Sequence, residues 1–121
     1  MKIAPSILSA DFANLKRDIY LVEENGADYI HIDIMDGHFV PNITMGPNIV
    51  QAIHSITKLP LDVHLMIENS ERFIEDFASA GADIISIHIE AAIHIHATLQ
   101  KIKKFHKKAG IVITPGTPIS A

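Results

Sequence analysis

The stretch His31–Asn42, which reads HIDIMDGHFVPN, determines the fold predicted for this chain. Side chains of a β-strand point alternately to its two faces, so the isoleucines here share one face while His31, Asp33 and Met35 share the other. An imidazole and a carboxylate two residues apart on one face can both reach a single metal ion. Asp36 and the glycine after it predict a turn. A polar pair at the end of a strand, followed by a loop, is where parallel α/β folds usually place their chemistry.

The composition predicts one soluble, folded domain in the cytoplasm. With 121 residues, of which 48% are hydrophobic, the chain can bury a core. No apolar run approaches the roughly 20 residues that span a bilayer, and no signal peptide is evident, so we expect no membrane partner. The net charge of -4 gives no basic surface for nucleic acid. Cysteine is absent, so any metal must be held by histidine or carboxylate side chains.

Strand and helix patterns alternate along the chain. We expect strands over Ile3–Leu8, Tyr29–Met35, Leu61–Met66, Ile84–Glu90 and Ile111–Thr114. We expect helices between these strands. The first has core positions Leu15, Ile19 and Val22, and the second begins at Pro47. The third is capped by Asn69 or Ser70 and has an inner face of Phe73, Ile74 and Phe77, and the fourth covers about 93–107. Glycines at 26 and 81 are predicted to end the first and third helices.

This order predicts an α/β fold of the βα (TIM-type) barrel class. Strands that alternate with helices pair in parallel through right-handed crossovers. Several strands keep aliphatic side chains on one face and polar ones on the other, which favours a barrel over an open sheet covered by helices on both faces. A complete eight-stranded barrel needs about 250 residues, and this chain supplies four βα units plus a fifth strand. The first and fifth strands would then be unpaired edges. Either the remaining half of the barrel was lost or removed, or another copy or another chain supplies it.

His31, Asp33 and His64 lie on the inward faces of neighbouring predicted strands, where two imidazoles and one carboxylate form a three-ligand set with room for substrate. Asp62 and His88 are candidate outer partners for the histidines. The competing interpretation is that these polar groups fill a barrel interior by hydrogen-bonding one another.

Asp33 is the candidate proton-transfer group. A carboxylate that touches a metal and faces a cavity can move a proton at a carbon beside a carbonyl, because the metal stabilises the resulting enediolate. Ser6 could bind a substrate hydroxyl, although a lone serine there is usually structural. Met35 and Met66, at equivalent strand positions, could form an apolar floor or belong to the core.

Four segments resemble the ribulose-phosphate 3-epimerase family, and they span nearly the whole chain in the family's order: Pro5–Phe12, His31–Asn42, Asp62–Met66 and Pro115–Pro118. The resemblance implies a βα barrel that interconverts D-ribulose 5-phosphate and D-xylulose 5-phosphate through a metal-stabilised 2,3-enediolate. It implies that residues 1–121 are the N-terminal part of a single such barrel. A pentulose phosphate is then the expected substrate, and a homo-oligomer the expected assembly.

The resemblance also assigns roles to individual residues. It implies that His31, Asp33 and His64 bind one divalent metal ion, and zinc, iron, manganese and cobalt all suit such ligands. Asp33 would also be one of two acid/base groups. The substrate contacts would be Ser6, His64, Met35 and Met66.

The chain departs from the family pattern in its missing second half. The family's opposing aspartate, which is also the fourth metal ligand, and its glycine-rich phosphate loops have no counterpart here, so we expect this chain alone to be inactive or nearly so. Thr114 stands where the family more often has asparagine. Two other functions stay open: a hexulose-phosphate 3-epimerase of the allulose 6-phosphate type, and a non-catalytic half-barrel that binds a metal or a partner chain.

Overall fold

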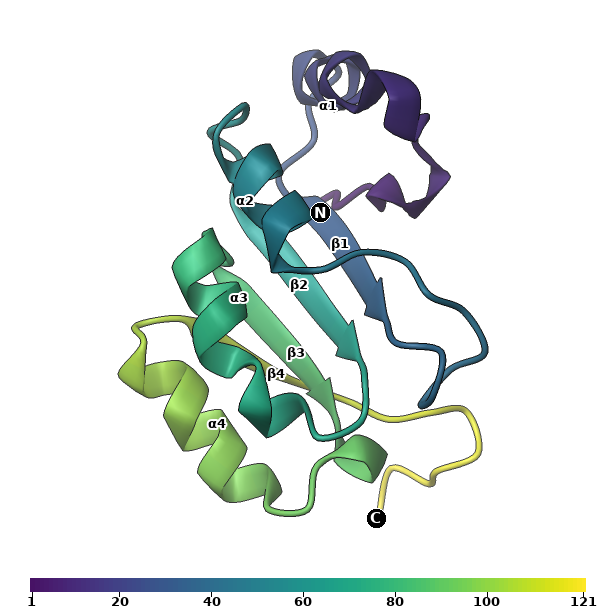
Figure 1. Cartoon of the computed structure of the whole chain (residues 1–121), viewed down its shortest axis with the longest axis vertical. Helices are drawn as coiled ribbons and strands as arrows, with labels where there is room; N and C mark the ends of the chain where they lie inside the picture. Colours follow the sequence, from purple (N-terminus) through teal and green to yellow (C-terminus); the bar gives the residue numbers. More distant parts are fainter.

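The computed structural model describes the whole chain, Met1–Ala121, and contains one parallel sheet. Its strands are β1 (Ile30–Met35), β2 (Leu61–Met66), β3 (Ile84–His88) and β4 (Lys108–Val112), and each pairs in parallel with the next in the chain. The strands therefore end at one common edge, where the loops that follow β1 and β4 also lie (Figure 1). This is the α/β arrangement predicted from the alternating patterns.

Four α-helices connect or precede these strands. They are α1 (Leu15–Glu24), α2 (Pro47–His54), α3 (Ile74–Ala80) and α4 (Ile95–Lys104). Helices α2, α3 and α4 cover the same face of the sheet, and α1 lies beyond the start of β1 (Figure 1). The prediction that glycines end α1 and α3 is confirmed, because Gly26 and Gly81 have φ of 88° and 112°, a region that side chains rarely adopt.

The core lies between the sheet and these helices. The aliphatic side chains of β1 and β2 alternate with polar ones, and their aliphatic members are at most 3% exposed: Ile30, Ile32, Ile34, Leu61, Val63 and Leu65. Ile85 and Ile87 of β3 are also fully buried. Burial of these side chains against the helices holds the opposite, polar face of each strand in a defined direction.

The prediction that Ile3–Leu8 forms a strand is wrong. Only Ser6 forms a β-bridge, with His31, although backbone N–H groups near the start of β1 donate to the carbonyls of Ile3 and Pro5. Proline lacks the N–H that a ladder needs, and the Ser6 hydroxyl accepts from the backbone N–H of Leu8, which bends residues 7–9 into a 3₁₀ turn. The segment still runs beside β1 as an edge.

Several other boundaries differ from the prediction. Strand β3 ends at His88, where residues 89–91 form a 3₁₀ turn, and β4 begins at Lys108 because its backbone pairs with β3 from Ile84 onward. Asn69 adopts the left-handed conformation, with φ of 51°, and its side chain caps no helix. Helix α3 starts at Ile74, after Phe73, which is 38% exposed. The ends of each element depend on the segments that pair with it or pack against it, and sequence patterns alone do not show these segments.

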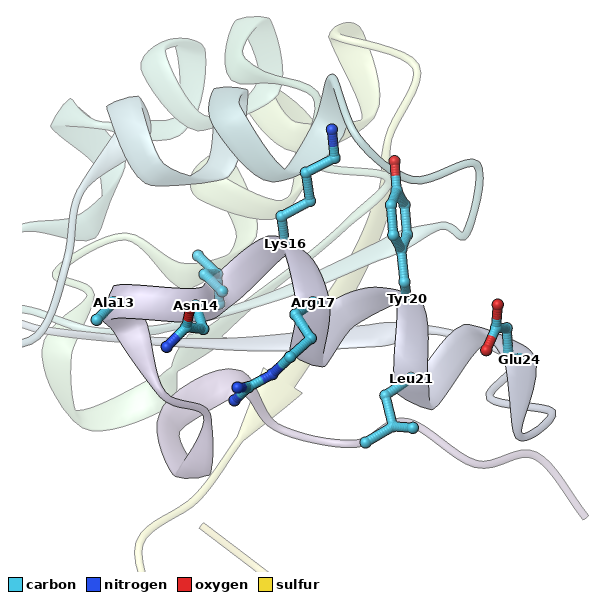
Figure 2. Close-up of a pocket in the computed structure, with 8 residues that line it drawn as sticks. Ala13, Asn14, Lys16, Arg17, Tyr20, Leu21 and Glu24 are labelled. Carbon is cyan, nitrogen blue, oxygen red and sulfur yellow. The ribbon is translucent and has the colours of Figure 1, made fainter.

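Apolar side chains stay exposed on the parts of the fold that lack neighbours. Ile3 beside β1, Leu21 on α1 and Ile111 on β4 are 52%, 57% and 55% exposed. A pocket on the outer side of α1 is lined by Leu21, Tyr20 and six further residues and contains none of the predicted site residues (Figure 2). No helix is long and apolar enough to cross a membrane.

Candidate metal centre

The register of β1 against β2 brings the predicted ligands together. Asp33 stands opposite His64, and His31 stands opposite Asp62. The side chains of His31, Asp33 and His64 are 25%, 14% and 16% exposed, so they lie on the polar face while remaining open to a ligand. The predicted alternation of strands β1 and β2 is what places them on one surface.

A single carboxylate oxygen is the centre of this cluster. His31 Nε2 lies 3.2 Å from Asp33 Oδ1, and His64 Nδ1 lies 3.1 Å from the same oxygen. One ligand atom from each of these residues can be chosen so that all three lie within 4.8 Å of one another. This spacing suits three ligands of one metal ion, with further coordination positions left for other groups.

Each of the three side chains has its second polar atom held by a partner. His31 Nδ1 lies 2.8 Å from Asp62 Oδ2, the Ser6 hydroxyl donates to Asp33 Oδ2 at 2.6 Å, and His64 Nε2 lies 2.8 Å from His88 Nε2. Outer partners of this kind orient metal ligands and select their tautomers. The donor set and its supports therefore fit a divalent cation, which agrees with the predicted outer roles of Asp62 and His88.

The surroundings shift the pKa of each candidate ligand. The hydrogen bond with Asp62 raises the pKa of His31, whereas burial lowers the pKa of His64. Burial also acts to raise the pKa of Asp33, but the Ser6 hydroxyl and the two imidazoles outweigh it and lower that pKa overall. Asp33 is therefore a carboxylate at neutral pH, which is the form that binds a metal.

Comparison with known proteins identifies the family that the sequence motifs resemble, over nearly the whole chain. The Ribulose-phosphate 3 epimerase family model matches residues 2–121. The chain belongs to the ribulose-phosphate 3-epimerase family. It is 62% identical over 119 residues to the ribulose-phosphate 3-epimerase of Bacillus subtilis, with 98% of this chain and 55% of that protein covered.

The chain also matches two further family members over nearly its whole length. The identity is 60% with the ribulose-phosphate 3-epimerase of Synechocystis, over 97% of this chain and 52% of that protein. It is 54% with the chloroplastic ribulose-5-phosphate-3-epimerase of Arabidopsis thaliana, over 98% of this chain and 43% of that protein. The chain thus spans about half the length of the curated relatives it matches. The family fold is a TIM barrel, and the parallel sheet described above is part of one.

The other predicted site residues of this family member lie beside the cluster. Met35 and Met66 are paired across β1 and β2 at the ends of both strands, and both are half-buried. Ser6, predicted to contact substrate, donates its hydroxyl to Asp33 in this structure. Ser6 thereby orients the carboxylate predicted to move the proton.

Two supporting residues were not predicted. The Thr44 hydroxyl accepts from the backbone N–H of Met35 and donates to the carbonyl of Asp33, so it holds the end of β1. Glu90 Oε1 accepts from the backbone N–H and hydroxyl of Thr114, and from the hydroxyl of Thr117. The Thr44 contacts span 9 and 11 residues, whereas the Glu90 contacts span 24 and 27. The Pro115–Pro118 motif was the nearest available signal in the sequence for the Glu90 contacts.

The Glu90 contacts predict a pH dependence of stability. They lower the pKa of Glu90 from 4.5 to about 2, chiefly through the Thr117 hydroxyl and the Thr114 N–H. A carboxyl with a lowered pKa stabilises the fold above its unfolded pKa, and the contribution is lost as pH falls through the folded value. The difference in unfolding free energy between the wild type and Glu90→Gln is therefore expected to shrink between pH 4.5 and 2.

Chemical denaturation at a series of pH values measures this difference. Glu24→Gln, on the exposed side of α1, removes the same charge elsewhere and is the matched control. A difference between wild type and Glu90→Gln that stays constant across the window would contradict the prediction.

Proposed function

We propose that residues 1–121 are the N-terminal part of a single ribulose-phosphate-binding barrel that converts D-ribulose 5-phosphate to D-xylulose 5-phosphate with the help of a metal. The observation that carries this proposal is the convergence of His31 Nε2 and His64 Nδ1 on Asp33 Oδ1, in a chain of this family. The names of the relatives supply the reaction, and the cluster supplies groups suited to it.

His31, Asp33 and His64 would hold one divalent cation, for which zinc, iron, manganese and cobalt are the candidates. A bound cation would supply Lewis-acid stabilisation of the negative charge that develops on the substrate oxygens. The lowered pKa of Asp33 keeps its carboxylate ready to accept a proton.

Asp33 would remove the proton from C3 of the ketose, beside the C2 carbonyl, and the electron pair would move to the carbonyl oxygen to form the 2,3-enediolate. The Ser6 hydroxyl would hold the carboxylate in position through Oδ2. Inversion at C3 needs a proton from the opposite face. The other carboxylate at the cluster, Asp62, already contacts His31, so this acid is expected outside residues 1–121.

The remaining parts of the proposal concern the substrate and the assembly. His64, Met35 and Met66 would line the reacting carbons, with the methionines providing a polarizable apolar surface. The exposed apolar side chains Ile3 and Ile111 on the free edges support association with further polypeptide, and a homo-oligomer in the cytoplasm is the assembly and location we propose.

The test compares residues 1–121 with a joined protein that continues into the C-terminal part of the Bacillus subtilis relative. With added zinc, manganese, iron or cobalt, we expect the joined protein to convert ribulose 5-phosphate, and residues 1–121 to bind the metal with little or no turnover. Faster conversion of allulose 6-phosphate would favour the hexulose-phosphate enzyme. A folded, metal-loaded joined protein that epimerises neither sugar would overturn the proposal and leave a metal-binding half-barrel.

A further inference from the structure

His88 is a buried histidine that makes only one hydrogen bond. It ends β3, is 6% exposed, and packs against the Phe39 ring at a centroid distance of 4.8 Å. Its Nε2 lies 2.8 Å from His64 Nε2, and the two rings stack with an interplanar angle of 24°. Its Nδ1 is buried without a hydrogen-bond partner, and Glu90 Oε2 lies 3.4 Å from it.

The two histidines form a chain between two carboxylates. Asp33 Oδ1 lies 3.1 Å from His64 Nδ1 at one end, and Glu90 faces His88 Nδ1 at the other. In its neutral form each imidazole carries one N–H. One of the two Nε2 atoms must donate to the other, so both protons point either toward Asp33 or toward Glu90.

Only one of these two arrangements prepares His64 for a metal. A cation at the cluster needs the free electron pair of His64 Nδ1, so the His64 proton must lie on Nε2. His88 Nε2 then accepts this proton in a hydrogen bond, which places the His88 proton on Nδ1, opposite Glu90. A carboxylate is an acceptor only, so Glu90 stabilises this arrangement and not the reverse.

The position of Glu90 is set by the loop that follows β4. Its Oε1 accepts from the backbone N–H of Thr114 at 2.7 Å, from the Thr114 hydroxyl at 2.9 Å and from the Thr117 hydroxyl at 2.5 Å. These contacts lower the pKa of Glu90 to about 2, so it is ionised under ordinary conditions. They also leave Oε2 free to face His88.

We propose that Glu90 is a positioning residue that selects, through His88, the tautomer of His64 whose Nδ1 is free to bind a divalent cation. This inference rests on the proposed metal centre. Glu90 acts on the metal ligand His64 through one intervening imidazole, that of His88. Loss of an outer partner of a metal ligand typically weakens metal binding about 10–100-fold.

The first measurement is the Zn²⁺ affinity of residues 1–121, determined by competition with a chromophoric chelator. We expect Glu90→Gln to weaken binding about 10-fold, because the amide can donate to His88 Nδ1 and thereby favour the reverse arrangement. Glu24→Gln removes the same charge from the exposed side of α1 and is the matched control. This control is expected to bind Zn²⁺ within about two-fold of the wild type, well below the loss that removal of an outer partner causes.

The second measurement is the His88 tautomer in the metal-free wild type, where the Asp33 carboxylate favours the reverse arrangement, read from long-range proton–nitrogen NMR correlations. We expect the proton on Nδ1, a result that a purely structural role of Glu90 does not require. A proton on Nε2 would overturn the inference, and this reading stands even if Glu90→Gln fails to fold. Equal Zn²⁺ affinity of Glu90→Gln and wild type, or an equal loss in Glu24→Gln, would also overturn it. A wild type that binds no Zn²⁺ would instead refute the proposed metal centre, and the inference with it.

Discussion

His64→Ala is expected to weaken Zn²⁺ binding by residues 1–121 at least about 100-fold, since loss of an outer partner alone typically costs 10–100-fold. His64 supplies one of only three side-chain ligand atoms in the cluster. Its removal leaves His31 and Asp33, and it also leaves His88 Nε2 without its hydrogen-bond partner. Isothermal titration with Zn²⁺ at neutral pH measures the change.

His96→Ala is the matched control for this experiment. His96 lies exposed on α4, so its substitution removes an imidazole without touching the cluster. It is expected to bind Zn²⁺ as the wild type does. If His64→Ala retained the affinity of His96→Ala, His64 would be a polar residue of the barrel interior and not a metal ligand.

Asp33→Asn is expected to lower the turnover of the joined protein about 1,000-fold or more, because general acid–base catalysis typically contributes 10²–10⁴-fold and metal binding weakens as well. The carboxamide cannot accept the C3 proton, and its nitrogen cannot ligate a cation. Its other contacts are expected to persist, since the amide oxygen can still accept from the Ser6 hydroxyl. Measurement of turnover and of deuterium uptake at C3 from heavy water, at saturating metal, separates proton removal from metal loss.

Asp76→Asn removes an exposed carboxylate from α3 and is the corresponding control, with turnover expected to equal that of the wild type. Deuterium uptake in Asp33→Asn at a rate close to that of Asp76→Asn would assign proton removal to another group. In that case the cluster would retain a metal-binding role, and the base would have to be sought among the residues that face it.

The local pattern of the chain was sufficient to predict the three candidate ligands and the class of fold. Alternation of side chains is a property of the extended backbone itself, so the buried isoleucines of β1 imply that His31 and Asp33 lie on the opposite face. The same rule applied to β2 predicts that His64 lies on this face. Glycines with positive φ likewise end helices for a reason that concerns one residue at a time.

Contacts between distant segments decided the rest. Whether Ile3–Leu8 forms a strand depends on the neighbours available to its backbone, and here the single bridge at Ser6 is all that forms. The ring nitrogen that His64 turns toward Asp33 depends on His88, which is 24 residues away. The role of Glu90 depends on a loop equally far along the chain. Hydrogen-bond partners and strand ends are set by which groups the folded chain brings within reach, and a periodic pattern carries no information about that.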